Sequence, residues 1–151
     1  MTAHPLLVRL AAALTLAAGS ATAAFADDQA ALAAAAKEPG AKVTASGLVF
    51  KSLRPGTGAS PAATDVVKVN YRGTFPNGTE FDASAKHGGP VSFPLNHVVP
   101  CWTEGVQLLK VGGKAKLTCP SALAYGPRGA GGVIPPNATL VFEVELVGIG
   151  G

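Results

Sequence analysis

The C-terminal segment 139–148, TLVFEVELVG, alternates between two kinds of side chain over almost its whole length. One set of alternate positions is entirely apolar, and it consists of Leu140, Phe142, Val144 and Leu146. The other set includes two acidic residues, Glu143 and Glu145. Because successive side chains of a β-strand point to opposite faces, this pattern predicts a strand with one buried and one wet face. Such strands are typical of antiparallel sheets, and their apolar face needs a covering layer.

Two other segments, 66–71 and 114–119, show the same alternation. The residues that we expect to face the core are Val67, Val69, Tyr71, Ala115, Leu117 and Cys119. A turn signal at 76–78, Pro-Asn-Gly, follows the first of these strands and predicts a connection to another strand. The chain from residue 43 onward is therefore predicted to be mainly an antiparallel sheet.

One segment has a helical period instead. In CWTEGVQLLKVGG (101–113), the apolar residues Trp102, Val106 and Leu109 recur at the spacing of one helix face. Pro100 suits the first turn of a helix, and the glycines at 112–113 suit its end. A single short helix among strands has to bury its apolar stripe against the inner face of the sheet. The predicted class is therefore α+β, with one core between helix and sheet.

The first 26 residues have the order of a secretory signal peptide. An apolar run follows Arg9, and a small-residue stretch closes on Ala24-Phe25-Ala26, which fits a cleavage site. The run is too short to span a bilayer. We therefore predict three parts: a signal peptide at 1–26, an alanine-rich arm or linker at 27–42, and a globular domain at 43–151. After cleavage of the signal peptide we expect no membrane attachment.

The charged residues are scattered along the chain. The formal net charge is only +3, and no basic cluster stands out. Nucleic-acid binding needs a concentrated basic surface, so we expect no nucleic-acid partner.

The two cysteines, Cys101 and Cys119, are separated by 17 residues, a spacing that fits no redox or zinc motif. In an oxidising compartment two cysteines most often form a disulfide. Here the bridge would join the start of the helix to an inward-facing strand position. Two buried free thiols are the main alternative. A metal site that also uses His87 and His97 is a further one, although nothing in the sequence fixes a ligand geometry, and we predict no metal.

Seven motifs that follow one another along the chain resemble a known family. They are VNYRG (69–73), NGTEFDAS (77–84), VSFPL (91–95), VVPCWTEGV (98–106), GGKAKLTCP (112–120), LAYG (123–126) and VIPPNATLVFEVEL (133–146). In this order they resemble the FKBP-type peptidyl-prolyl cis-trans isomerases, and especially the secreted bacterial branch that includes the macrophage infectivity potentiator proteins. The resemblance covers residues 44–149.

The resemblance implies a five- or six-stranded antiparallel sheet wrapped around one short helix, with an apolar pocket between them for a proline ring. It implies catalytic roles for Tyr71, Asp82, Tyr125 and Phe142. It implies substrate-binding roles for Phe81, Phe93, Val98, Val99, Trp102 and Ile134. Trp102 would form the floor, and the Tyr125 hydroxyl and the Ile134 N–H would donate hydrogen bonds to substrate carbonyls. Asp82 would orient the site, and the Gly- and Pro-rich segment 124–136 would be a flap over the substrate.

The activity implied by the resemblance is rotation of X-Pro bonds in exported proteins that are still folding, in the bacterial periplasm or outside the cell. This chemistry needs no nucleophile and no cofactor. The pocket pattern also implies that macrolides could bind. Two features depart from the family: Cys101 replaces the glycine of many members, and the long N-terminal dimerisation module of the infectivity potentiators is missing, so we expect a monomer.

Two other classes of function compete with this interpretation. A non-catalytic module could bind proline-containing segments without turning them over. A hydrolase would need a nucleophilic Ser or Cys with His and Asp partners. The chain contains no G-x-S-x-G motif, and a disulfide would occupy Cys101.

Overall fold

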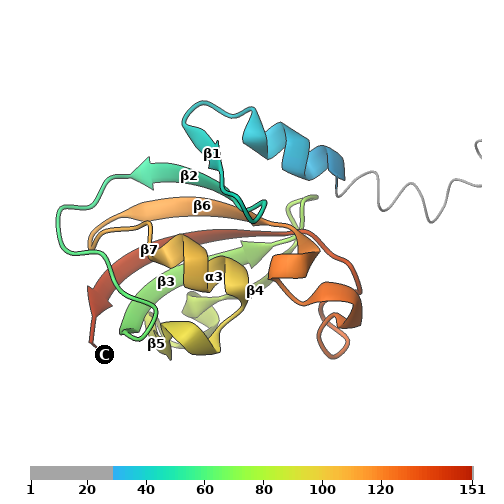
Figure 1. The fold of residues 1–151 in the computed structure, drawn as a ribbon. Coiled ribbons are helices and arrows are strands. Elements are labelled where there is room, and N and C mark those ends of the chain that lie inside the picture. The colour runs from blue at the N-terminus through green and yellow to red at the C-terminus, as the bar shows by residue number, and fades with distance from the viewer. Residues whose placement is uncertain (1–28, 151) are drawn as a thin grey trace, which may run out of the picture.

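The computed structural model describes residues 29–150 as a curved antiparallel sheet that wraps around one face of a short helix (Figure 1). The predicted signal peptide at 1–26 lies outside the described residues. The strands are β1 (Ala41–Val43), β2 (Val49–Arg54), β3 (Val66–Thr74), β4 (Glu80–Ala83), β5 (Val91–Pro94), β6 (Lys114–Cys119) and β7 (Leu140–Ile149), and the covering helix is α3 (Pro100–Val106). Four 3-10 turns connect them: η1 (Ser84–His87), η2 (Leu95–His97), η3 (Ser121–Leu123) and η4 (Gly126–Arg128). The predicted antiparallel sheet around a short helix is confirmed.

The strand order in the sheet is β1-β2-β6-β7-β3-β4, and β5 also pairs with β3. All pairings are antiparallel, and β7, the longest strand, lies at the centre between β6 and β3. The described residues thus contain seven strands, not five or six. The shortest strands are β1, with three residues, and β4 and β5, with four residues each. β1 is too short to show an alternating pattern.

The core lies between α3 and the concave face of the sheet. The inward residues of β7 are 0–4% exposed, as the alternation predicts. On the helix side Trp102, Val106 and Leu109 are all buried, although α3 itself ends at Val106. Gly105 lets the helix approach the sheet closely, because a Cβ at this position would lie 2.8 Å from both methyl carbons of Leu117.

The alanine-rich arm packs against the domain. Residues 29–36 are helical and lie on the side of the sheet away from α3, and Ala35 is buried (Figure 1). Glu38 accepts hydrogen bonds from Lys116, at 2.7 Å, and from Lys51, at 3.0 Å. Residues 41 and 42, which we assigned to the arm from the sequence, belong to β1. Within residues 29–150 no helix has the length and apolar character needed to cross a membrane.

Candidate active site

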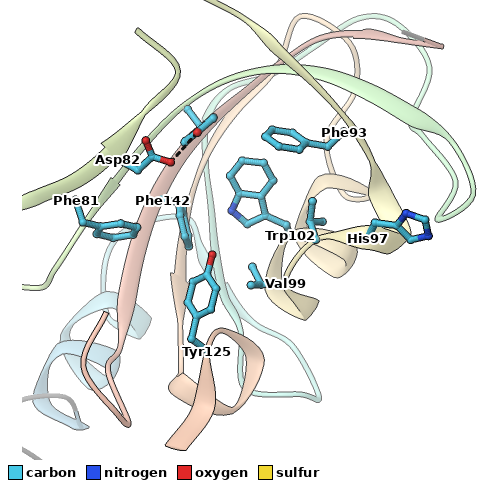
Figure 2. A pocket seen from close by; sticks show the side chains of 10 residues that line it. Phe81, Asp82, Phe93, His97, Val99, Trp102, Tyr125 and Phe142 are labelled. Atoms are coloured by element: carbon cyan, nitrogen blue, oxygen red, sulfur yellow. Dashed lines mark hydrogen bonds between the residues drawn. The ribbon is translucent and has the colours of Figure 1, made fainter. Parts of the chain in front are cut away.

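A cavity of about 460 Å³ opens between α3 and the concave face of the sheet (Figure 2). Its walls come from six separate parts of the chain: β3, β4, β5, the η2–α3 junction, the segment before η4, and β7. The lining residues are Tyr71, Phe81, Asp82, Phe93, His97, Val98, Val99, Trp102, Tyr125 and Phe142. Nine of the ten residues that the sequence assigned to the site therefore line one cavity; the tenth, Ile134, does not.

Trp102 forms the floor of the cavity. Its side chain is on the buried face of α3 and is only 4% exposed. Three aromatic rings meet it edge-on: Tyr71 with centroids 5.2 Å apart, Phe142 at 5.4 Å, and Phe93 at 5.6 Å. Edge-to-face contacts of this kind contribute about 0.5–1.5 kcal/mol each beyond area burial. They fix the plane of the indole, so the floor is rigid and apolar.

The indole N–H of Trp102 has no hydrogen-bond partner among residues 29–150, although the atom is buried. A buried donor left without a partner costs about 1–3 kcal/mol. The cost is borne by a side chain that also lines the cavity.

One wall of the cavity depends on a glycine. Phe81 of β4 meets Phe142 of β7 edge-on, with centroids 5.6 Å apart. Both rings lie over Gly73 of β3, where an added Cβ would be 2.6 Å from the Phe81 ring and 3.0 Å from the Phe142 ring. The glycine of the VNYRG motif therefore makes room for two pocket rings.

The polar side of the cavity is organised by Asp82 on β4. Its carboxylate accepts a hydrogen bond from the Tyr71 hydroxyl at 2.8 Å and from its neighbour, the Ala83 N–H, at 2.9 Å. Its Oδ1 also lies 3.0 Å from Nε2 of His87. Desolvation alone would raise the pKa of Asp82, but these hydrogen bonds outweigh it and the pKa is lowered. Asp82 is thus held as an anion.

The net pKa shift of the two tyrosines is opposite to that of Asp82. Desolvation, reinforced by the Asp82 carboxylate, raises the pKa of Tyr71 far above its usual value, and the pKa of Tyr125 is raised for the same reasons. Both therefore keep their protons and can donate. The Tyr71 hydroxyl is committed to Asp82, whereas the Tyr125 hydroxyl extends into the cavity (Figure 2) and has no partner among the hydrogen bonds within residues 29–150.

Ile134 is placed differently from the sequence expectation. Its side chain is buried in the core and does not line the cavity. Its N–H donates to the Ala130 carbonyl at 2.9 Å, within a small bridge that closes the flap. A hydrogen bond from this N–H to a substrate would require the flap bridge to open.

Two histidines belong to this region although we assigned them no role from the sequence. His97, at the end of η2, lines the cavity. His87, at the end of η1, reaches back to Asp82. Neither position shows a periodic signal, because both lie in short 3-10 turns whose direction depends on the surrounding strands. The only sequence hint at the contact between His87 and Asp82 is that the two residues are five positions apart.

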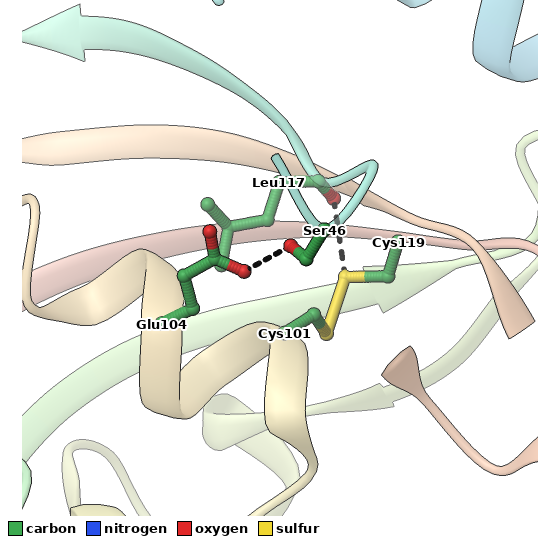
Figure 3. The surroundings of a disulfide bond; sticks show 5 residues. All are labelled: Ser46, Cys101, Glu104, Leu117 and Cys119. Carbon is green, nitrogen blue, oxygen red and sulfur yellow. Dashed lines mark hydrogen bonds between the residues drawn. A yellow bond between two sulfur atoms is a disulfide. The ribbon is translucent and has the colours of Figure 1, made fainter. Parts of the chain in front are cut away.

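The predicted disulfide is confirmed: Cys101 and Cys119 are bonded, with Cα atoms 5.9 Å apart (Figure 3). Both residues are fully buried. The bond joins the first turn of α3 to the end of β6, directly beside Trp102. It removes the alternatives of free thiols and of a cysteine metal site.

The antiparallel sheet around a short helix and the aromatic cavity between them are the features that the resemblance to the FKBP-type family implied, and comparison with known proteins agrees on the family. Residues 58–147 match the family described as FKBP-type peptidyl-prolyl cis-trans isomerase. The chain belongs to this family.

Three relatives illustrate the match. The chain is 58% identical over 118 residues to the FKBP-type isomerase FkpA of Aeromonas hydrophila, covering 78% of this chain and 44% of the relative. It is 44% identical over 118 residues to the outer membrane protein MIP of Legionella longbeachae, covering 78% and 51%. The crystal structure of FkpA from Escherichia coli superposes with a TM-score of 0.82 at 41% identity, covering 99% of this chain and 70% of that one. The chain thus spans about half the length of the curated relatives that it matches.

Proposed function

We propose that the protein is a peptidyl-prolyl cis-trans isomerase that acts on X-Pro bonds of exported proteins during folding. The observation that carries this proposal is the apolar cavity over the buried indole of Trp102, with one carboxylate held as an anion at its edge. The family membership supports the reaction class.

The chemistry explains why such a cavity suffices. Rotation about a peptide bond has a barrier of about 18–20 kcal/mol, because amide resonance is lost at the twisted geometry. For X-Pro bonds the resulting isomerisation is slow enough to limit folding. The twisted amide is less dipolar than the planar one, so a water-poor apolar cleft that fits it lowers the barrier. A gain of roughly 4–6 kcal/mol accelerates the reaction by thousands or more.

In this proposal each wall of the cavity has a task. Trp102 is the floor beneath the proline ring, and Phe142, Phe81 and Val99 shape the slot around it. The Tyr125 hydroxyl donates to a substrate carbonyl. Asp82 positions the Tyr71 ring through their 2.8 Å hydrogen bond. The remaining lining residues that the sequence indicated, Phe93 and Val98, extend the apolar wall.

The same proposal extends to ligands and location. The reaction breaks no covalent bond, so these residues act without a cofactor. An apolar cavity of this shape suits the ring of a macrolide inhibitor. We further propose a location in the periplasm or outside the cell, on the basis of the signal-peptide pattern at 1–26.

A refolding assay limited by proline isomerisation tests the function. The protein should accelerate refolding, and Asp82→Ala should reduce kcat/KM by about tenfold or more, because Tyr71 loses its anchor. Glu80→Gln is the matched control: it also lies on β4 but outside the cavity, and it should keep full activity. Absence of acceleration by the wild-type protein would refute the proposal.

The same samples separate the isomerase from a pure binding module. A proline-containing peptide that changes the fluorescence of Trp102, the chain's one tryptophan, without any acceleration would favour the binding module.

A further inference from the structure

A second groove lies beside the isomerase cavity, on the other side of the η2–α3 junction. Its volume is about 680 Å³. Half of its lining residues are apolar and half are polar: Val98, Pro100, Leu108 and Leu123, and Asn96, Thr103, Glu104 and Gln107. We call it the α3 groove.

The α3 groove exposes a side chain that would ordinarily be buried. Leu108 follows α3 directly and is 52% exposed, whereas its neighbour Leu109 is 3% exposed and packs in the core. A single exposed leucine carries no meaning. This one lies in a concave surface with three other apolar residues, one of which, Leu123, comes from η3 at the base of the flap.

The α3 groove adjoins the isomerase cavity. Val98 lines both of them. Two adjacent residues of α3 face different hollows: Trp102 forms the cavity floor, and Thr103 lines the groove. A polypeptide with its proline ring on Trp102 has to leave the cavity, and an extended chain advances about 3.3 Å per residue. A few residues of such a chain that pass Val98 reach the α3 groove.

We propose that the α3 groove binds the segment of an unfolded client polypeptide adjacent to the isomerised proline, with an apolar side chain of the client packed against Leu108 and Leu123. This inference rests on the proposed isomerase function. The occupant that fits is the same client chain, because the groove adjoins, at Val98, the cavity in which its proline sits, and offers mainly apolar contacts. Glu104 at its edge makes acidic client residues unfavourable there.

The proposal predicts different behaviour of short and long substrates. A tetrapeptide fills the cavity and ends before the α3 groove, so its turnover does not depend on Leu108. An unfolded protein engages both surfaces. The groove contacts are the same for planar and twisted amide, so they lower KM and leave kcat unchanged.

The experiment compares kcat/KM for a proline tetrapeptide and for proline-limited refolding of an unfolded protein. Leu108→Ser should leave the tetrapeptide value within about twofold and reduce the protein value about fivefold, through KM, because part of one leucine contact is lost. Leu108→Gln is a second variant that should act in the same direction. Leu53→Ser on β2 is the matched control, since Leu53 is 43% exposed and lines neither surface, and it should change neither value.

Several results would overturn the proposal. Unchanged refolding kinetics in both Leu108 variants would show that the groove binds no client. An equal loss with tetrapeptide and protein would place the effect in the cavity. A concentration-dependent dimer, abolished by Leu108→Ser in sedimentation, would assign the groove to a second copy of the chain. If the wild-type protein does not act even on the tetrapeptide, the isomerase function itself fails, which is a separate outcome.

Discussion

Loss of the Cys101–Cys119 bond should destabilise the domain by about 3 kcal/mol. The bond closes a loop with a sequence separation of 18 residues, and the chain-entropy treatment gives this value for a loop of that length. For a domain of this size the loss corresponds to a melting temperature lower by roughly 10 °C. In urea, with a slope of about 1–3 kcal/mol/M, the midpoint should fall by roughly 1–3 M.

The effect should also reach the proline site, because Cys101 directly precedes Trp102. The bond fixes the first turn of α3 against β6, so its reduction should loosen the cavity floor and raise KM for a proline tetrapeptide. Urea titration of oxidised and reduced wild-type protein, followed by Trp102 fluorescence, measures the difference in the free energy of unfolding. Both sulfur atoms stay in place in this comparison. The double variant Cys101→Ala/Cys119→Ala is the control, since reductant should not change its unfolding curve.

Two results would refute this reasoning. Coincident urea curves for oxidised and reduced protein would show that the bond does not constrain the unfolded chain. Two reactive thiols in the denatured, unreduced protein would show that the bond is absent.

Two further predictions concern the pocket walls. Gly73→Ala should cost about 1–3 kcal/mol of stability and lower kcat/KM, because the new methyl group displaces the rings of Phe81 and Phe142. Gly148→Ala on β7 is the control, since there is open space around Gly148, and it should change neither stability nor kcat/KM. Equal effects of the two variants in urea melts and peptide assays would contradict the argument. Because the pKa of Asp82 is lowered, its contribution to stability and activity should be present above about pH 4 and be lost only as the pH falls through its folded-state pKa. A pH–rate profile in the His87→Gln background isolates Asp82, and an acid limb centred near pH 6 in that background would contradict the assignment.

The burial pattern of the strands could be predicted from the sequence because it depends on local geometry. Alternation over β7 correctly indicates the four inward residues from Leu140 to Leu146, and the spacing of Trp102, Val106 and Leu109 correctly indicates the buried face of α3 and the turn after it. Neither prediction needs knowledge of which strands are neighbours. The strands β1, β2 and β5 were not predicted from the sequence pattern, because backbone pairing with a neighbour defines them.

The candidate site could be predicted in part from the sequence, and in part it depends on the tertiary structure. The family resemblance indicated nine of the ten lining residues, but their distances follow from strand pairing: Gly73 and Phe142 are register partners, and this places the Phe142 ring beside Phe81. The contact of His87 with Asp82 and the engagement of the Ile134 N–H within the flap were not predictable, since each is set by the path of a turn.

The sequence by itself determined the buried faces of β6, β7 and α3 and that the two cysteines could meet, because strand and helix periods and residue chemistry are local properties. Only the tertiary structure decided which atoms are partners: that the Tyr71 hydroxyl binds Asp82, that the indole N–H of Trp102 is left without a partner, and that a second groove adjoins the cavity. Those relations join residues on different elements, and their geometry exists only once the sheet has closed around α3.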